Sequence, residues 1–396
     1  MHRSLTVTLA CLGMVGALAI DTYLPSIPAI GREFGVGPLA VQQTLSLFLF
    51  AFAFMMLFYG TLSDSFGRRR VLLAALSVYT LASIGAAFAP TFGFLLGCRV
   101  LQGLSAGAGS VLSAAIVQDR FSGAQAQKLM SHIMMVFGLA PAIAPVLGGY
   151  LHVAFGWRST FVFLFLFGLA MIVLCYRALP ESLPPEKRQP FHPATIARNY
   201  LMVLRRGKFV LLSLTLGMAF GGLSLYIGSA AHFVIDILGK SETGFAWLFI
   251  PLIGGMMVGS ALAGKFAARW NPVTLVRIGF ALMGLSGVAG VAYNSLFAAE
   301  TPWAVLPLAM YTFGLAIAMP AIQVKALSLF PDNRGLAASM QAFIQMMSFA
   351  LVSGFLAPLL FDSALKLAYG LAGTLAVSYL FWRTSGAEND PAPRRG

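Results

Sequence analysis

Asp21 is the first residue whose type and position could do chemistry, because it ends an apolar run that begins near Leu5. The chain contains only 13 Asp and Glu among 396 residues, and nearly all the others fall in expected loops or at helix ends. A carboxylate at bilayer depth is costly and usually faces a bundle interior or a water-filled path. A lone acid in that setting can bind and release a proton, so we interpret Asp21 as a proton carrier.

Arg99 is a basic residue within another apolar segment, and Gln102 follows it by three positions. An arginine at that depth needs a partner or water, and Asp21 is the partner that we expect. In the alternative interpretation, the Arg99 side chain extends to the membrane surface. The first interpretation makes Asp21 and Arg99 the residues of proton coupling.

Two further patterns combine glycine with residues that constrain a turn or a helix. Between the second and third apolar runs, Gly60, Asp64 and Gly67 precede Arg68 and Arg69. The glycines allow a tight turn, while the acid and the arginines can form charge-assisted hydrogen bonds. Topology-determining positive charges would explain the arginines but not the glycines with Asp64.

The second pattern lies in the fifth apolar run. Its residues are Gly138, Pro141, Pro145, Gly148 and Gly149. Prolines remove backbone donors and glycines permit bending, so this helix can act as a hinge. A purely structural Gly/Pro packing site is the alternative.

Twelve apolar segments must position these groups, each about as long as a helix that crosses a bilayer core. Their expected ranges are 5–29, 39–62, 70–90, 92–118, 127–152, 157–178, 207–237, 242–267, 273–294, 303–329, 333–361 and 364–383. A hydrophobic fraction of 59%, 10% charged residues and a mean hydropathy of +0.84 exclude an ordinary soluble domain. We therefore predict an all-α integral membrane protein.

The one long polar segment, 179–206, is rich in proline and basic residues and reads as a solvated cytoplasmic linker. It separates a six-helix half, 1–178, from a second six-helix half, 207–396, with a short cytoplasmic tail. After the second helix of each half comes a related segment, but Ala268 stands in the second copy where Asp64 stands in the first. Related halves with a site between them are a common plan of secondary transporters.

The net charge of +13 comes from basic residues scattered between the apolar segments, so we expect a bilayer and not nucleic acid as the surrounding partner. Lys and Arg concentrate on one side, which predicts that both termini are cytoplasmic. The first segment also resembles a cleaved secretory signal. The division into six plus six helices favours its retention.

The pattern from Gly60 to Leu72 resembles the signature loop of the major facilitator superfamily. The resemblance implies a conformational latch made by Gly60, Asp64, Gly67, Arg68 and Arg69, with Asp119 as its acidic partner. Arg99-x-x-Gln102-Gly103 resembles an intramembrane motif of the same family. The fifth-helix pattern is similar to an antiporter motif, but Ala144 replaces the glycine that usually precedes the second proline, which weakens the inference of antiport.

Asp21-Thr-Tyr-Leu-Pro, together with segments 155–158 and 183–192, resembles the Bcr/CflA branch of that family. The branch consists of bacterial inner-membrane drug-resistance transporters associated with bicyclomycin- and chloramphenicol-type compounds. The resemblance implies export of a small drug-like substrate in exchange for protons, with the proton as coupling ion, no other cofactor and no metal. We expect a monomer to suffice. The second half matches mainly in helix number and texture.

We expect eight residues to line a substrate cavity. Its candidates are Tyr23, Gln102, Met135, Tyr226, Phe249, Tyr311, Gln341 and Gln345. Gln341 and Gln345 share one helix face, as cavity-lining groups would, although hydrogen bonding between helices gives the same pattern. The aromatic residues are equally explained as packing.

No nucleotide-binding motif Gly-x-x-x-x-Gly-Lys-Ser/Thr occurs, so a proton gradient is the expected energy source. A proton-coupled uptake symporter for a small metabolite is the main alternative on the same fold. An intramembrane enzyme is disfavoured because no metalloprotease motif or Ser/His pair at a shared depth appears.

Overall fold

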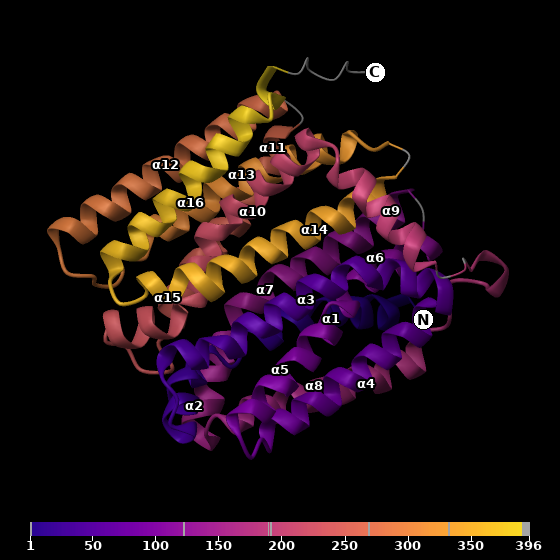
Figure 1. Cartoon of the computed structure of the whole chain (residues 1–396), viewed down its shortest axis with the longest axis horizontal. Helices are drawn as coiled ribbons and strands as arrows, with labels where there is room; N and C mark the ends of the chain where they lie inside the picture. The colour runs from indigo at the N-terminus through magenta and orange to yellow at the C-terminus, as the bar shows by residue number, and fades with distance from the viewer. Residues whose placement is uncertain are drawn as a thin grey trace. The chain divides into compact units, whose positions relative to one another are not determined.

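The computed structural model describes residues 2–121, 123–188, 190, 192–267, 270–331 and 333–389, and every regular element among them is a helix (Figure 1). Within this described part, twelve helices are long and apolar enough to cross a membrane, which confirms the number predicted from sequence. Contacts along the chain divide it into two units, Met1–Ile196 and Ala197–Gly396. Six of the twelve spans fall in each unit.

The first unit contains the helices before the polar segment. They are α1 (His2–Asp21), the 3-10 turn η1 (Leu24–Ser26), α2 (Ile27–Phe34), α3 (Pro38–Phe66), α4 (Arg68–Ala87), α5 (Phe92–Ala106), α6 (Ala108–Arg120), α7 (Gly123–Phe155) and α8 (Arg158–Ala178). Segment 179–206, expected as a linker, contains the 3-10 turn η2 (Pro185–Lys187) and the helix α9 (Pro193–Leu204).

The second unit contains two short π-helical segments, η3 (His232–Ile237) and η4 (Val352–Leu356). Its other elements are α10 (Gly207–Gly228), α11 (Ala246–Ala267), α12 (Pro272–Leu296), α13 (Leu306–Ser328), α14 (Arg334–Leu351), α15 (Ala357–Leu360), α16 (Ala364–Thr384) and the 3-10 turn η5 (Ala387–Asn389). The π-helical segments extend or interrupt the seventh and eleventh spans, which the apolar pattern predicts as uniform.

The two units repeat one set of helix pairs. In the first unit, α1 packs against α7, α3 against α5, and α4 against α8. In the second, α10 packs against α14, α11 against α13, and α12 against α16. Counted by span, each set pairs the first helix with the fifth, the second with the fourth and the third with the sixth. The weak sequence repeat thus corresponds to a repeated packing scheme.

The first span is broken immediately after Asp21. Residue 21 ends α1, two turn residues follow, and η1 leads into α2. Proline causes the break, because Pro25 has no N–H to bond the Asp21 carbonyl as an α-helix requires. The acid therefore occupies a helix interruption, the kind of place where transporters expose backbone groups to a site.

Candidate proton-coupling site and cytoplasmic latch

Asp21 is buried at the break in the first span, with 3% of its surface exposed. Its Oδ1 atom has no hydrogen-bond partner among the described residues, and neither does the Oγ1 atom of adjacent Thr22. Burying an unpaired charge costs far more than burying a neutral acid. Asp21 is therefore a buried carboxyl group with unused hydrogen-bonding capacity at the break of the first span.

Arg99 is wholly buried in α5, so its side chain does not extend to the membrane surface. Its guanidinium donates to the carbonyl oxygens of Thr44, at 2.9 Å, and Ala19, at 3.1 Å. The rings of Tyr23 and Phe48 lie 4.2 and 4.4 Å from the guanidinium carbon. Carbonyl dipoles and aromatic faces thus take the place that a carboxylate was expected to fill.

The expected ion pair between Asp21 and Arg99 is absent from this structure, in which no described acidic side chain bonds Arg99. Helix geometry explains the difference. Arg99 contacts the backbone carbonyl oxygen of Ala19 in α1 and the ring of Tyr23, which lies in the turn after α1. Asp21 is two residues from Ala19, so its side chain is rotated roughly 200° around the helix axis.

Gln102 and Tyr23, both predicted as cavity residues, are neighbours of Arg99. Gln102 accepts a hydrogen bond from Arg99 at 2.9 Å and donates one to Ser83 at 2.8 Å. The hydroxyl of Tyr23 lies 3.3 Å from that of Thr44. A polar network thus runs across four helices, and one Arg99 nitrogen in it, Nη2, has no partner among the described residues.

Helix α7 approaches the break in the first span through Gly148. A Cβ atom at this position would overlap the carbonyl oxygen of Thr22. Pro141 and Pro145 both lie inside α7, which is continuous from Gly123 to Phe155. Gly149 is buried, while Gly138 has open space where a side chain would go. Gly148 is therefore the residue of this pattern at which the structure requires a glycine. The role of α7 as a hinge stays a prediction.

The predicted latch residues come together between α3 and α4. Arg68 pairs with Asp64 at 2.6 Å and with Asp119 of α6 at 3.1 Å. Gly67 joins the two helices with a φ of +95°, a conformation that side chains disfavour. Arg69 donates to the carbonyl oxygen of Tyr176 in α8, at 2.8 Å. Gly60 has open space around it.

Glu181 also belongs to this cluster, although the sequence motifs do not include it. Its carboxylate accepts hydrogen bonds from the backbone N–H groups of Arg68, at 2.9 Å, and Arg69, at 3.3 Å. These are the first two residues of α4, whose N–H groups have no partner within the helix. A Cβ atom on Gly67 would lie 2.6 Å from the same carboxylate. The position of Glu181, three residues after the end of α8, is visible in the sequence. The N–H groups that it binds lie over a hundred residues earlier in the chain, so the sequence does not identify them.

We expect Glu181→Ala to lower the free energy of unfolding by about 1 kcal/mol, the usual effect of losing a helix N-terminal cap. The amides of Arg68 and Arg69 should exchange hydrogen faster, because they lose their acceptor. Hydrogen exchange measured by mass spectrometry checks this. Glu186→Ala, on the exposed turn η2, is the matched control, and equal exchange in both variants would contradict the capping role.

The remaining cavity candidates lie mostly inside the second unit. Tyr226, Phe249 and Tyr311 are buried, and Tyr311 donates a 2.6 Å hydrogen bond to the Ala219 carbonyl. Gln341 is buried with neither amide atom bonded to a described residue, whereas Gln345 is half-buried. The side chain of Met135 lies outside the described part of the chain. A cavity role for this group stays a prediction. Among its described members, Gln341 has an amide group whose two polar atoms are free to bond a substrate.

Comparison with known proteins identifies the family. Residues 9–358 match the sequence pattern of the Major Facilitator Superfamily. A bicyclomycin resistance protein homolog of Haemophilus influenzae is 30% identical over 373 residues, which cover 94% of each chain. A chloramphenicol resistance protein of Pseudomonas aeruginosa is 26% identical over 324 residues, covering 81% of this chain and 76% of that protein.

Solved structures agree on the fold. A D-xylose-proton symporter superimposes with a TM-score of 0.75 at 19% identity, covering 96% of this chain and 97% of the other. A human organic anion transporter gives a TM-score of 0.69 at 20% identity, covering 96% and 99%. These likenesses concern the fold alone, and they confirm the predicted fold class. By its family match and by a relative 30% identical over nearly its whole length, the chain belongs to the major facilitator superfamily.

Proposed function

We propose that this protein exports small drug-like compounds in exchange for protons, by alternating access. The observation that carries the proposal is Asp21, a buried carboxyl group at the break in the first span, whose Oδ1 atom has no partner among the described residues. The names of two relatives, a bicyclomycin resistance protein homolog and a chloramphenicol resistance protein, support an antibiotic of that kind as substrate. The protein would act in the bacterial inner membrane as a monomer, with both termini cytoplasmic.

The proposed coupling runs through α1 and needs no direct ion pair. A proton arriving from outside neutralises Asp21, which favours the inward-opening state. Substrate binding from inside favours proton release and the outward-opening state. The Ala19 carbonyl binds Arg99 while Asp21 ends the same helix, so a change at the acid can reach the arginine network through two residues of backbone. Each ligand shifts the equilibrium by its different affinity for the two states.

The cluster of Asp64, Arg68 and Asp119 is proposed as the two-state latch. Arg68→Ala removes both ion pairs, so we expect it to slow conformational exchange more than it weakens substrate binding. Single-molecule fluorescence with one dye on each half measures exchange, and equilibrium binding measures affinity. Arg70→Ala is the control because Arg70 is exposed on the same turn. Affinity that falls in Arg68→Ala while exchange rates stay constant would refute the latch.

A drug-susceptibility screen tests the proposed function. An efflux-deficient bacterial host expressing the protein should tolerate higher concentrations of bicyclomycin, chloramphenicol or a related compound than the same host with an empty vector. The direction of transport separates the two candidate functions on this fold. If cells that express the protein accumulate less of the compound to which they are resistant, the result supports export. Proton-driven accumulation of a metabolite, with no resistance to any compound, would support uptake instead.

A further inference from the structure

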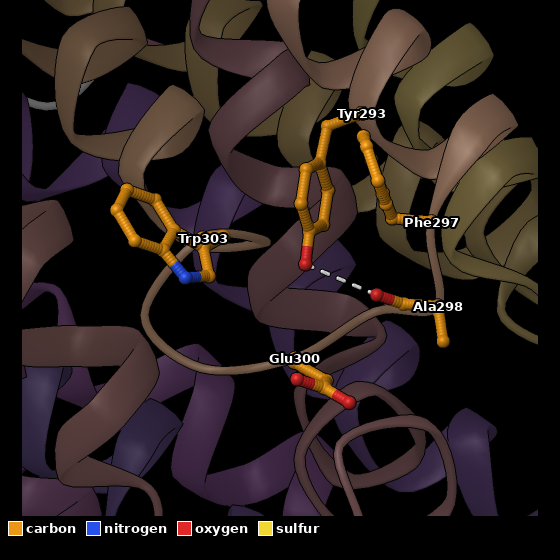
Figure 2. Close-up of a pocket in the computed structure, with 5 residues that line it drawn as sticks. All are labelled: Tyr293, Phe297, Ala298, Glu300 and Trp303. Atoms are coloured by element: carbon orange, nitrogen blue, oxygen red, sulfur yellow. Dashed lines mark hydrogen bonds between the residues drawn. The ribbon is translucent and has the colours of Figure 1, made fainter.

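A pocket of about 350 Å³ opens between the end of α12 and the start of α13, in the second unit. Tyr293, Phe297, Ala298, Glu300 and Trp303 line it (Figure 2). Its volume lies within the range of small-molecule sites. It is at the end of α12 opposite Arg277, the end that the charge pattern predicts to be extracytoplasmic.

Three aromatic rings present their faces or edges to this pocket. Tyr293 and Phe297 are stacked, with centroids 5.6 Å apart and planes inclined by 29°. The Tyr293 hydroxyl donates a 3.0 Å hydrogen bond to the Ala298 carbonyl, which holds that ring in place. Figure 2 shows the Trp303 indole on one side of the opening and the Tyr293 and Phe297 rings on the other. Trp303 is 60% exposed and Phe297 63% exposed, so both rings lie at the surface of the protein.

The charge of the pocket has one sign. Glu300 lies below the rings in Figure 2, and within the described residues its carboxylate has no ion pair or hydrogen bond. The sequence has no Lys, Arg or His between Arg277 and Lys325. The aromatic faces and the carboxylate therefore act on a bound charge in the same direction, because both attract cations.

Another exposed tryptophan of the same unit supplies a contrast. The ammonium of Lys240 lies 5.9 Å from the centroid of the Trp247 ring, so the chain provides that tryptophan with its own cation. No described cation lies over Tyr293, Phe297 or Trp303. Aromatic residues at a span end often serve only as anchors in the membrane interface. The pocket differs from a purely aromatic anchor in having the carboxylate of Glu300 in its lining.

We propose that the pocket formed by Tyr293, Phe297, Glu300 and Trp303 binds a small organic cation, of the alkylated ammonium class. Rings recognise the apolar substituents and the positive charge together, and Glu300 adds the counter-charge. None of the five lining residues is basic, so the lining itself supplies no partner for the phosphate of a zwitterionic lipid. A simple cation therefore fits better than a phospholipid headgroup. This proposal stands whether or not the protein exports drugs.

Choline and its uncharged counterpart, 3,3-dimethylbutan-1-ol, test the proposal because they differ in charge at nearly constant shape. Binding to the purified full-length protein in maltoside micelles is measured by saturation-transfer NMR. We expect wild type to bind choline more tightly than the alcohol. Glu300→Gln should weaken choline binding about fivefold, the upper effect of one exposed charge pair, and Trp303→Leu should have a similar effect.

Glu242→Gln and Trp247→Leu are the matched controls, and we expect both to bind choline like wild type. Equal binding of choline and the alcohol, or unchanged choline binding in Glu300→Gln, would overturn the proposal. Glu300 is exposed, so its variant should fold even where Trp303→Leu does not. Competition by added phosphatidylcholine would identify a lipid ammonium group as the source of the cation. Undiminished choline binding in its presence would identify a soluble one.

Discussion

Asp21→Asn is expected to reduce transport driven by a pH gradient to the level of protein-free vesicles, while substrate exchange without a gradient continues. Asparagine keeps the shape of the buried side chain but cannot bind or release a proton. The substitution therefore removes the coupling group at the break of the first span without adding volume there. Exchange persists because alternating access itself needs no titrating group in this mechanism.

Proteoliposomes with an acidic interior measure this effect. Wild type should accumulate a compound identified by the susceptibility screen, and Asp21→Asn should not. Preloaded vesicles without a gradient should exchange labelled for unlabelled compound with both proteins. Asp362→Asn is the control, because this carboxylate is exposed and pairs with Lys366 at 2.6 Å. Gradient-driven accumulation that survives in Asp21→Asn would remove Asp21 from the coupling mechanism.

Gly148→Ala is expected to destabilise the protein by at least about 2 kcal/mol, the middle of the usual range for overpacking a well-packed core. The added methyl group would occupy the position of the Thr22 carbonyl oxygen, so α7 must move away from α1. The displaced contact lies next to Asp21. We therefore expect transport to fall together with thermal stability.

Gly138→Ala provides a control in the same helix. A Cβ atom there has open space, and alanine favours helix over glycine by about 1 kcal/mol, so this variant should be as stable as wild type or more so. Unfolding temperature in detergent, measured by scanning fluorimetry, compares the two variants. Equal stability of Gly148→Ala and Gly138→Ala would show that the approach of α7 to α1 tolerates a side chain.

The sequence predicts well what depends on local pattern. Apolar segments of membrane-spanning length place all twelve spans, mostly within a few residues of the observed ends, because hydropathy is a property of each segment alone. The ion pair of the proposed latch is also local, because Asp64 and Arg68 are four residues apart along the chain. The family also follows from these motifs, and its match is confirmed.

What the sequence does not predict depends on rotation and on distant contacts. Pairing Asp21 with Arg99 needs the angular position of both side chains, and two residues of offset on α1 turn the acid away from the arginine. Glu181 caps a helix whose first residue precedes it by 113 positions, so no local pattern marks it. The role of Gly148 depends on the approach of one backbone to another, which periodicity does not encode.

Glu181 shortens the length of free chain that connects α8 to α9. Its Oε1 atom also accepts the N–H group of Leu183 at 3.2 Å, so the chain is held to α4 as far as that residue. From Leu183 to the first residue of α9, Pro193, a fully extended chain spans at most roughly 35 Å, against roughly 50 Å from the end of α8. One carboxylate thus shortens the tether by about a third. While Glu181 keeps these contacts, the shorter tether limits how far the start of α9 can lie from α8.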